Sequence, residues 1–272
     1  MTILHVSDLH FDKRWFHWLS VFAPRHDVLV IAGDLLDHAH PAAPAKQADW
    51  IGGWIRGHHK PLCICSGNHD LLDQSRGIPF HRQAALIAEW LTLHPRPVCV
   101  CSGNSDLEFL PPGQPRRPAT WLRALSRPRL RVDGDTAFLH GRSIEVAGYR
   151  EAPRGTADIW LVHLPPTDTP VARSEYGIDL GDKGLPALVR EHRPRLVLSG
   201  HVHHPEAWFH EEDGTIYLNP GCSRGSRIPH HILIEPDRFA ATRVTEGPIG
   251  SYSETVLWPA APSEREHEQL SA

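Results

Sequence analysis

The sequence predicts an α/β protein in which a parallel sheet, built from the first half of the chain, is followed by a second, mostly antiparallel sheet. The first half contains apolar runs at Ile3–Val6 and Val28–Ala32 with a helix-like segment between them. A strand-helix-strand order implies parallel pairing through a right-handed crossover. The second half is divided into short apolar runs separated by glycine and turn residues, a pattern typical of antiparallel strands.

The helices expected in the first half follow from the spacing of apolar residues. Trp15–Phe22 predicts one short helix, and Ala45–Arg56 predicts a second one with Ala48, Ile51 and Ile55 on one face. Both strands before these helices end in acidic turns, so they are expected to deliver polar side chains at their C-terminal ends.

The second half is expected to contain one helix, at Leu185–Glu191, among short strands. The strands are predicted at Leu130–Val132, Ala137–Leu139, Ile144–Ala147, Ile159–Val162, Leu196–Leu198, Ile216–Leu218 and Ile232–Ile234. The tail 259–272 is polar and contains proline, so we expect it to be disordered. Residues 1–258 are expected to form a single domain.

The composition is that of an ordinary globular protein, with 272 residues, 40% hydrophobic and 22% charged side chains and a net charge of −4. The sequence contains neither a secretion signal nor an apolar run of membrane-spanning length, so we expect a cytoplasmic protein without a membrane partner. The charge balance lacks the strongly basic character of proteins that hold nucleic acid by phosphate contacts alone, but it does not exclude a metal-dependent nuclease.

Four of the five cysteines form two C-x-C pairs, Cys63/Cys65 and Cys99/Cys101, inside apolar runs. A spacing of two places both members of a pair on one face of a strand. We interpret them as buried small apolar side chains in a reducing compartment, without a metal or redox role.

An internal repeat with a period of 36 residues relates segment 34–69 to segment 70–105. The string CICSGNHDL at 63–71 recurs as CVCSGNSDL at 99–107, Trp54 recurs as Trp90 and Pro61 as Pro97. We infer a tandem duplication of one helix-strand unit. The second copy is expected to add a helix and a strand to the sheet without a ligand role.

The repeat leaves open which copy supplies a side chain to a site. Asn68 recurs as Asn104, but His69 is replaced by Ser105, so only the first copy keeps an imidazole beside the asparagine. This difference favours Asn68.

Polar side chains with metal-binding chemistry follow several of the expected strands. The candidate ligands are Asp8, His10, Asp34, Asn68, His163, His201 and His203. The D-x-H and H-x-H spacings place both side chains on one side of an extended segment. Oxygen and nitrogen donors without a thiolate suit two neighbouring Mn, Fe, Zn or Mg ions and not a structural zinc finger. A carboxylate such as Asp34 can bridge two ions, and the water shared between them becomes a hydroxide nucleophile for phosphate esters.

The order of these motifs resembles the signature blocks of the calcineurin-like metallophosphoesterase superfamily. The blocks are SDLH at 7–10, GDLLD at 33–37, GNHD at 67–70, HLPP at 163–166 and GHVH at 200–203, followed by NPG at 219–221. The resemblance extends from Ile3 to about Glu235. It implies a two-sheet α/β/β/α sandwich with two divalent metal ions at the strand ends along one edge.

The resemblance also implies a role for each matching residue. One metal would be held by Asp8, His10 and His203, the other by Asn68, His163 and His201, and both by the bridging carboxylate of Asp34. His69 would contact the leaving group or a phosphate oxygen, and Asp70 would orient His69. The nearby His140 and His204 are assigned to turns or to the rim of the pocket.

Within the superfamily, several strings resemble small bacterial manganese-dependent phosphoesterases that act as DNA endonucleases. They are SDLHFDKRWFHWL, GDLLD, CSGNHDL, LVHLPP, and NPG followed by IPHHILIE. The resemblance implies a phosphodiesterase that uses Mn, with Zn, Fe, Ni or Mg as other metals, and that takes DNA as its substrate. No protein partner is indicated.

The walls of the site are less well defined by the sequence. Arg14, Arg224 and Arg227 are candidates for phosphate contact. The aromatic residues between 11 and 18 either stack on bases or form the buried face of the first helix. The alternatives are a phosphomonoesterase, a cyclic-nucleotide or small-molecule phosphodiesterase, and an inactive binding scaffold. The intact ligand set argues against the scaffold.

Overall fold

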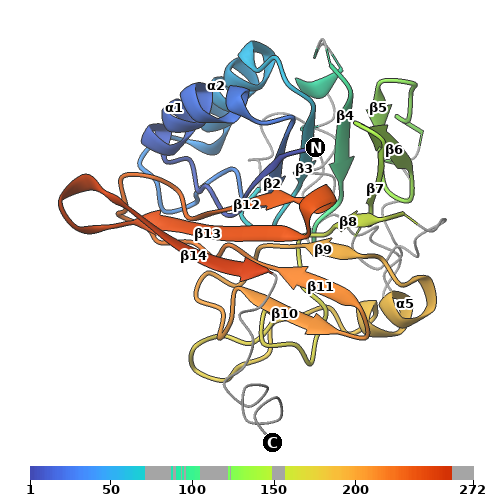
Figure 1. Ribbon diagram of the computed structural model, residues 1–272. Helices are drawn as coiled ribbons and strands as arrows, with labels where there is room; N and C mark the ends of the chain where they lie inside the picture. The colour runs from blue at the N-terminus through green and yellow to red at the C-terminus, as the bar shows by residue number, and fades with distance from the viewer. Residues whose placement is uncertain are drawn as a thin grey trace, which may run out of the picture.

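Two β-sheets stacked face to face form the centre of the molecule (Figure 1). The structure is a computed structural model and describes residues 1–70, 87, 90–92, 94, 96–104, 122, 124–148 and 157–258. The predicted tail 259–272, residues 71–86 of the second repeat unit and Ser105 lie outside the described residues.

The first sheet has the strand order β14-β13-β12-β1-β2-β3-β4-β5. Its strands are β1 (Ile3–Val6), β2 (Val28–Ala32), β3 (Leu62–Cys65), β4 (Val98–Cys101), β5 (Leu130–Arg131), β12 (His231–Glu235), β13 (Ala240–Glu246) and β14 (Tyr252–Trp258). Strands β1 to β4 are parallel, as predicted, β5 adds a further parallel pair, and β12 to β14 extend the sheet with antiparallel pairs. The runs beginning at Leu130 and Ile232 therefore belong to the first sheet, and their assignment to the second was wrong.

The second sheet has the order β10-β11-β9-β8-β7-β6. Its strands are β6 (Thr136–Leu139), β7 (Arg142–Val146), β8 (Ile159–Leu161), β9 (Leu196–Leu198), β10 (Phe209–Glu212) and β11 (Thr215–Leu218). The prediction of a mostly antiparallel sheet is wrong. Strands β7, β8, β9 and β11 pair in parallel, and only the β6–β7 and β10–β11 pairs are antiparallel.

The second sheet is mostly parallel because of the way in which the chain connects β8 to β9. Helix α5 (Leu185–His192) lies between them in the chain and returns it to the same end of the sheet. The sequence predicted this helix but not its consequence. The helix forms a crossover connection, and strands joined by a crossover run parallel. The short strands β8 and β9 are buried along their whole length, as is usual for strands of parallel sheets.

Helices α1 (Lys13–Phe22) and α2 (Pro44–Gly57) lie on the outer side of the first sheet (Figure 1). Asp12 caps α1, because its side chain accepts a hydrogen bond from the backbone N–H of Arg14. Trp15 and Phe16 are buried in the core, which confirms the interpretation that these aromatic residues form the inner face of the helix. Short 3-10 turns occur at Ala23–Arg25, Pro236–Arg238 and Pro248–Gly250.

Three apolar clusters hold the layers together. One lies between α1, α2 and the first sheet, the second lies between the two sheets, and the third lies between the second sheet and α5. Each fully buried leucine or isoleucine stabilises such layers by about 1.5–3 kcal/mol. The arrangement is an α/β/β/α sandwich, as predicted. None of the helices in the described part of the chain is long and apolar enough to cross a membrane.

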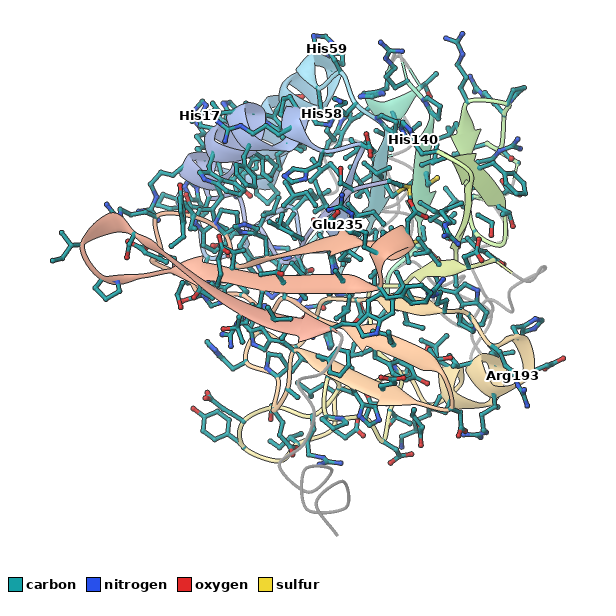
Figure 2. All side chains as sticks on the ribbon, viewed as in Figure 1. His17, His58, His59, His140, Arg193 and Glu235 are labelled. Carbon is teal, nitrogen blue, oxygen red and sulfur yellow. A yellow bond between two sulfur atoms is a disulfide. The ribbon has the colours of Figure 1, made fainter. Side chains whose placement is uncertain are left out.

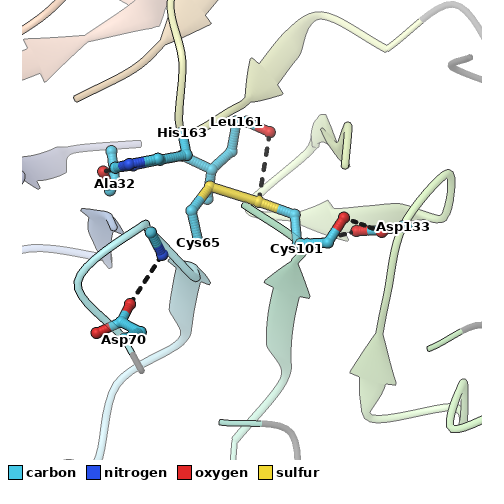
Figure 3. Close-up of a disulfide and its surroundings, with 9 residues drawn as sticks. Ala32, Cys65, Asp70, Cys101, Asp133, Leu161 and His163 are labelled. Carbon is cyan, nitrogen blue, oxygen red and sulfur yellow. Dashed lines mark hydrogen bonds between the residues drawn. A yellow bond between two sulfur atoms is a disulfide. The ribbon is translucent and has the colours of Figure 1, made fainter. Parts of the chain in front are cut away.

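The two C-x-C pairs lie side by side on neighbouring strands. Strands β3 and β4 pair Cys63 with Cys99 and Cys65 with Cys101, so each cysteine faces the residue 36 positions away. All four are buried, as expected, but Cys65 and Cys101 form a disulfide with their Cα atoms 4.7 Å apart (Figure 3). The interpretation as free apolar thiols is therefore wrong for these two. Adjacent parallel strands place facing residues within disulfide range, and the repeat supplies a cysteine at both positions.

Candidate metal centre

The predicted ligands gather at one edge of the sandwich, because the loops that carry them follow the C-terminal ends of neighbouring strands. The first sheet contributes loops after β1, β2 and β3, and the second sheet contributes loops after β8 and β9. In chain order these loops carry Asp8 and His10, Asp34, Asn68 and His69, His163, and His201 and His203.

Several of these residues have a left-handed backbone conformation, with positive φ, that residues other than glycine seldom adopt. Asp8, His10, Asp34 and His201 have φ angles of 51°, 43°, 46° and 67°. Each such residue costs of order 1 kcal/mol. Hydrogen bonds between the loops offset this cost, for example from the N–H of His10 to the carbonyl oxygen of Asp34 at 2.8 Å.

Gly33 is needed beside the site for two reasons. Its φ is 99°, and a Cβ atom at this position would lie 2.0 Å from Nδ1 of His163. The His163 ring can therefore pack directly on the backbone, and its Nδ1 lies 2.9 Å from the carbonyl oxygen of Ala32. This contact directs the other ring nitrogen, Nε2, toward the centre of the site.

The first group of ligand atoms comes from Asp8, His10, Asp34 and His203. One ligand atom of each lies within 4.8 Å of the others. The Nε2 atoms of His10 and His203 are 2.9 Å apart, and Nε2 of His10 is 4.0 Å from Oδ2 of Asp34. Such spacing allows all four side chains to contact one cation.

The second group comes from Asn68, His163 and His201. Oδ1 of Asn68 lies 3.3 Å from Nε2 of His163 and 2.9 Å from Nδ1 of His201. Nε2 of His163 is also 3.9 Å from Oδ1 of Asp34. Asp34 therefore directs one carboxylate oxygen toward each group, which is the placement required of a bridging ligand.

Asn104, the repeat counterpart of Asn68, follows β4 and not β3. Its Oδ1 is buried and has no hydrogen-bond partner among the described residues. The strand next to β2, which carries Asp34, is β3, so the structure brings Asn68 to the other candidate ligands.

We expect Asn68→Ala to reduce metal-dependent phosphoester hydrolysis by about 100-fold or more, because a direct ligand is lost. Asn104→Ala is the matched control and should stay within about threefold of the unmodified protein. Initial rates with bis-p-nitrophenyl phosphate at saturating Mn²⁺ measure both. A loss in Asn104→Ala with full activity in Asn68→Ala would assign the ligand to the other copy.

The electrostatics of the site fit divalent cations. Burial raises the pKa of Asp8 to about 7 and raises the pKa of Asp34 well above its ordinary range, where the nearby Asp8 adds to the effect. Burial also lowers the pKa of His201 and His203 to about 4, so these imidazoles are neutral and offer lone pairs. Buried carboxyl groups beside neutral imidazoles form an oxygen and nitrogen donor set that lacks a compensating positive charge, which divalent metal ions would supply.

The same shifts predict how the stability of the chelator-treated protein depends on pH. The lowered histidine pKa values mean that the unfolded chain binds more protons below pH 6.5, so the free energy of unfolding rises up to that pH. The raised pKa values of Asp8 and Asp34 mean that the folded protein binds more protons above pH 3.8, so they lower the free energy of unfolding through pH 7 and beyond.

Above pH 6.5 only the carboxyl contribution still changes, so we expect the free energy of unfolding to fall between pH 6.5 and 8. Urea unfolding at several pH values in the presence of a chelator measures this free energy. Saturating Mn²⁺ should reduce the decline, because a bound cation favours ionised carboxylates. A rise in stability over this interval without metal would contradict the assignment.

His69 is half-buried beside the first group of ligand atoms. Its backbone N–H donates to Oδ1 of Asp34 at 2.8 Å, its half-buried ring meets the His10 ring edge-on at 4.7 Å, and its Nδ1 has no hydrogen-bond partner among the described residues. The carboxylate near its ring is that of Asp37, since ligand atoms of His10, Asp37 and His69 lie within 4.8 Å of one another. Sequence reasoning missed Asp37, although it is the second acid of the GDLLD block.

Among the described residues, the hydrogen bonds of Asp70 go to backbone groups and not to the His69 ring, so its expected role in orienting His69 stays a prediction. Oδ1 of Asp70 accepts hydrogen bonds from the backbone N–H groups of Leu35 and Leu36 at 2.7 and 2.8 Å, and its Oδ2 accepts one from Gly67 at 2.8 Å. Figure 3 draws one of these bonds at Asp70. Backbone donors therefore contact both oxygens of this carboxylate. Its function is to join the loop after β2 to the loop after β3.

The three candidate arginines differ in their positions. Arg14 and Arg224 line a cavity of about 360 Å³ beside His10. Arg224 also lies 3.6 Å from Asp37. Arg227 is 61% exposed and pairs with Glu246, so the structure does not bring it to this cavity.

Two further residues near the centre were not predicted as functional. Sγ of Cys222 donates to the carbonyl oxygen of Asp8 at 3.2 Å and lies within 4.8 Å of ligand atoms of His10 and His203. Nδ2 of Asn219 donates to the carbonyl oxygen of Gly200 at 3.0 Å and so fixes the loop that carries the GHVH block. The NPG turn followed by cysteine was the available sequence signal for both.

His140 and His204 lie away from the ligand groups. His140 is exposed in the turn between β6 and β7, with a φ of 49°. His204 is exposed, and its carbonyl oxygen accepts a hydrogen bond from the N–H of Glu175. Both positions agree with the assignment to turns.

Comparison with known proteins gives the family. A family model described as calcineurin-like phosphoesterase matches residues 1–205, whereas no curated protein matches the chain. One crystal structure is 12% identical, with 94% of this chain and 98% of the other covered, and its TM-score of 0.56 shows a shared fold.

Two other solved structures are phosphoesterases by description. Yfce, a phosphoesterase from E. coli, is 13% identical with a TM-score of 0.40, covering 94% of this chain and 100% of its own. A predicted phosphoesterase from Streptococcus pneumoniae TIGR4 is 15% identical with a TM-score of 0.38, covering 94% and 97%. The family model alone spans most of the sequence, and the chain therefore belongs to the calcineurin-like phosphoesterases, a family of metal-dependent hydrolases.

Proposed function

We propose that this protein is a dinuclear phosphodiesterase that cleaves DNA with Mn²⁺. The observation that carries the dinuclear assignment is the Asp34 carboxylate, which directs Oδ2 toward the His10 group and Oδ1 toward the His163 group. A carboxylate shared in this way is expected where two ions act together on one phosphate.

In the proposed reaction, two divalent ions supply Lewis-acid polarisation of the phosphate and a lowered pKa for the attacking water. The protein supplies the remaining steps. The half-buried imidazole of His69 lies against the His10 ring, and in its protonated form it can donate a proton to the departing oxygen. The Asp37 carboxylate lies near the His69 ring and 3.6 Å from Arg224, so its negative charge favours the protonated form of His69.

The preference for a polymeric diester is supported by the cavity beside His10. Lys13, Arg14 and Arg224 line it, and the ammonium group of Lys13 lies 5.3 Å from the centre of the Phe11 ring. Arg14 pairs with Asp12 and Arg224 with Asp37 in the same lining, so the cavity carries a small net positive charge. A nucleic acid carries further phosphates beside the bond that is cleaved, which such a charge would attract. The proposal of Mn²⁺ is supported by the mixed carboxylate, amide and imidazole donor set.

The test compares substrates on the chelator-stripped protein. Bis-p-nitrophenyl phosphate is compared with p-nitrophenyl phosphate, and single-stranded with duplex DNA, across Mn²⁺, Mg²⁺, Zn²⁺ and Ni²⁺. Diester and DNA cleavage with Mn²⁺ would support the nuclease. Activity on the monoester alone would replace it with a phosphomonoesterase, activity on the small diester but not on DNA would replace it with a small-molecule phosphodiesterase, and inactivity with every metal would indicate a binding scaffold.

The role of His69 predicts a dependence on the leaving group. His69→Ala should slow hydrolysis of an alkyl diester by about 100-fold and that of bis-p-nitrophenyl phosphate much less, because nitrophenolate departs without protonation. Steady-state rates for the two substrates give the ratio. Equal losses on both would count against proton donation by His69.

A further inference from the structure

A second cavity, of about 460 Å³, lies at the edge of the sandwich opposite to the metal centre. We call it the rear pocket. Lys60 and Pro61 precede β3 and Arg96 and Pro97 precede β4, whereas the ligand loops follow the C-terminal ends of these parallel strands. Phe138, at the end of β6, forms another part of the wall. Figure 2 labels His59 and His140, which belong to the same lining.

The repeat places two cations side by side in the rear pocket. Lys60-Pro61 and Arg96-Pro97 are equivalent dipeptides of the two units, 36 residues apart. The carbonyl oxygen of Pro61 accepts from the N–H of Leu29 at 3.1 Å, and that of Pro97 accepts from Leu62 at 3.3 Å. Hydrogen bonds to a neighbouring strand therefore hold the backbone next to each cation in place.

The charge of the rear pocket is positive. Among the described residues, neither Lys60 nor Arg96 takes part in an ion pair. Asp27 is the acidic residue of the lining, and its Oδ2 already accepts hydrogen bonds from the N–H and Oγ1 of Thr2 at 2.7 and 3.2 Å. As far as the described residues show, Lys60 and Arg96 are therefore available to bind an anion from solution.

The wall also offers a flat apolar surface. Phe138 is 78% exposed, although it lies on a strand whose neighbours Ala137 and Leu139 are buried. Exposed aromatic rings beside cationic groups are the usual elements for binding a base together with its phosphate. The cavity volume lies within the range of small-ligand sites, about 300–1,000 Å³.

We propose that the rear pocket binds a nucleotide, with Lys60 and Arg96 contacting the phosphate and Phe138 contacting the base. The site is separate from the metal centre and does not rest on the proposed nuclease function. Its ligand class follows from the combination of two adjacent cations, an exposed aromatic ring and a cavity of nucleotide size.

The test measures binding of AMP and of inorganic phosphate by isothermal titration calorimetry, with a chelator present to remove metal ions. We expect saturable binding of AMP at one site. The double variant Lys60→Ala/Arg96→Ala should weaken it by about tenfold or more, because two charge-assisted hydrogen bonds are lost. Phe138→Ala should weaken the binding of AMP but leave the affinity for inorganic phosphate unchanged.

The matched control is Lys183→Ala/Arg190→Ala, which removes the same charge from the region around α5 and should leave the affinity unchanged. Thermal unfolding of each variant checks that it folds. Three results would overturn the proposal: no saturable binding of AMP, binding that is unaffected by Lys60→Ala/Arg96→Ala but lost in Arg224→Ala, or equal affinities for AMP and phosphate that Phe138→Ala leaves unchanged.

Discussion

Replacing Asp34 by asparagine is expected to reduce metal-dependent hydrolysis by at least about 10³-fold, because the side chain would keep its shape but lose the charge shared by both ligand groups. The same variant should make the chelator-treated protein more stable. Asp34 is 1% exposed and lies near Asp8, so burial and repulsion disfavour its charge in the folded protein. Removing this cost should raise the free energy of unfolding by about 1 kcal/mol or more at pH 8.

The measurement is a pair of assays on each variant: hydrolysis of bis-p-nitrophenyl phosphate with Mn²⁺, and thermal unfolding with chelator and with Mn²⁺. Asp213→Asn is the matched control, because Asp213 is exposed and shares the left-handed backbone of Asp34, with φ angles of 50° and 46°. It should change neither quantity. Two results would contradict the assignment of Asp34 to the metal centre. One is normal hydrolysis of the diester by Asp34→Asn, and the other is an unfolding temperature that still rises with Mn²⁺ as much as that of the unmodified protein.

Replacing Asp70 by alanine is expected to cost about 3 kcal/mol or more of folding stability. Three buried backbone N–H groups, those of Leu35, Leu36 and Gly67, would lose their acceptor. For a chain of this length the unfolding temperature should fall by about 10 °C. Hydrolysis should also fall for all substrates alike, because the loops that carry Asp34 and Asn68 would no longer be joined.

Asp70→Asn separates the two possible roles of this residue. Its carbonyl oxygen can still accept from Leu35 and Leu36, but its amide group cannot accept from Gly67. We therefore expect a stability between those of the unmodified protein and Asp70→Ala. If Asp70→Ala were fully stable and slowed only substrates with poor leaving groups, Asp70 would act through His69 after all. Urea unfolding and rates on two diesters decide between these outcomes.

The parallel half of the first sheet could be predicted because β1 and β2 are apolar along their length and have a helix between them. The second sheet could not, because strands such as β8 and β9 are three residues long and look alike in either direction. Their direction depends on whether the chain between them crosses over. That property lies in the path of α5 and not in the composition of the strands.

The candidate ligands could be predicted one by one, since each lies in a short motif at the end of an apolar run. Two of the three partners of Asp70, Leu35 and Leu36, could not, because they lie 35 and 34 residues away on another loop. The preference for Asn68 over Asn104 rested on a single sequence difference, His69 against Ser105. Both asparagines follow nearly identical strings, and the order of strands in the sheet is the structural feature that brings Asn68 to Asp34.

The duplicated unit also changes the position of the strand that carries Asn68. With β4 and β5 beyond it, β3 is an interior strand of the sheet, and its end is further fixed by the hydrogen bond from the N–H of Ser66 to the carbonyl oxygen of Cys101 at 2.9 Å. Without them it would be an edge strand with one side of its backbone exposed to other chains and to solvent. The strand of the second repeat unit thus covers the backbone edge of the strand that leads to Asn68.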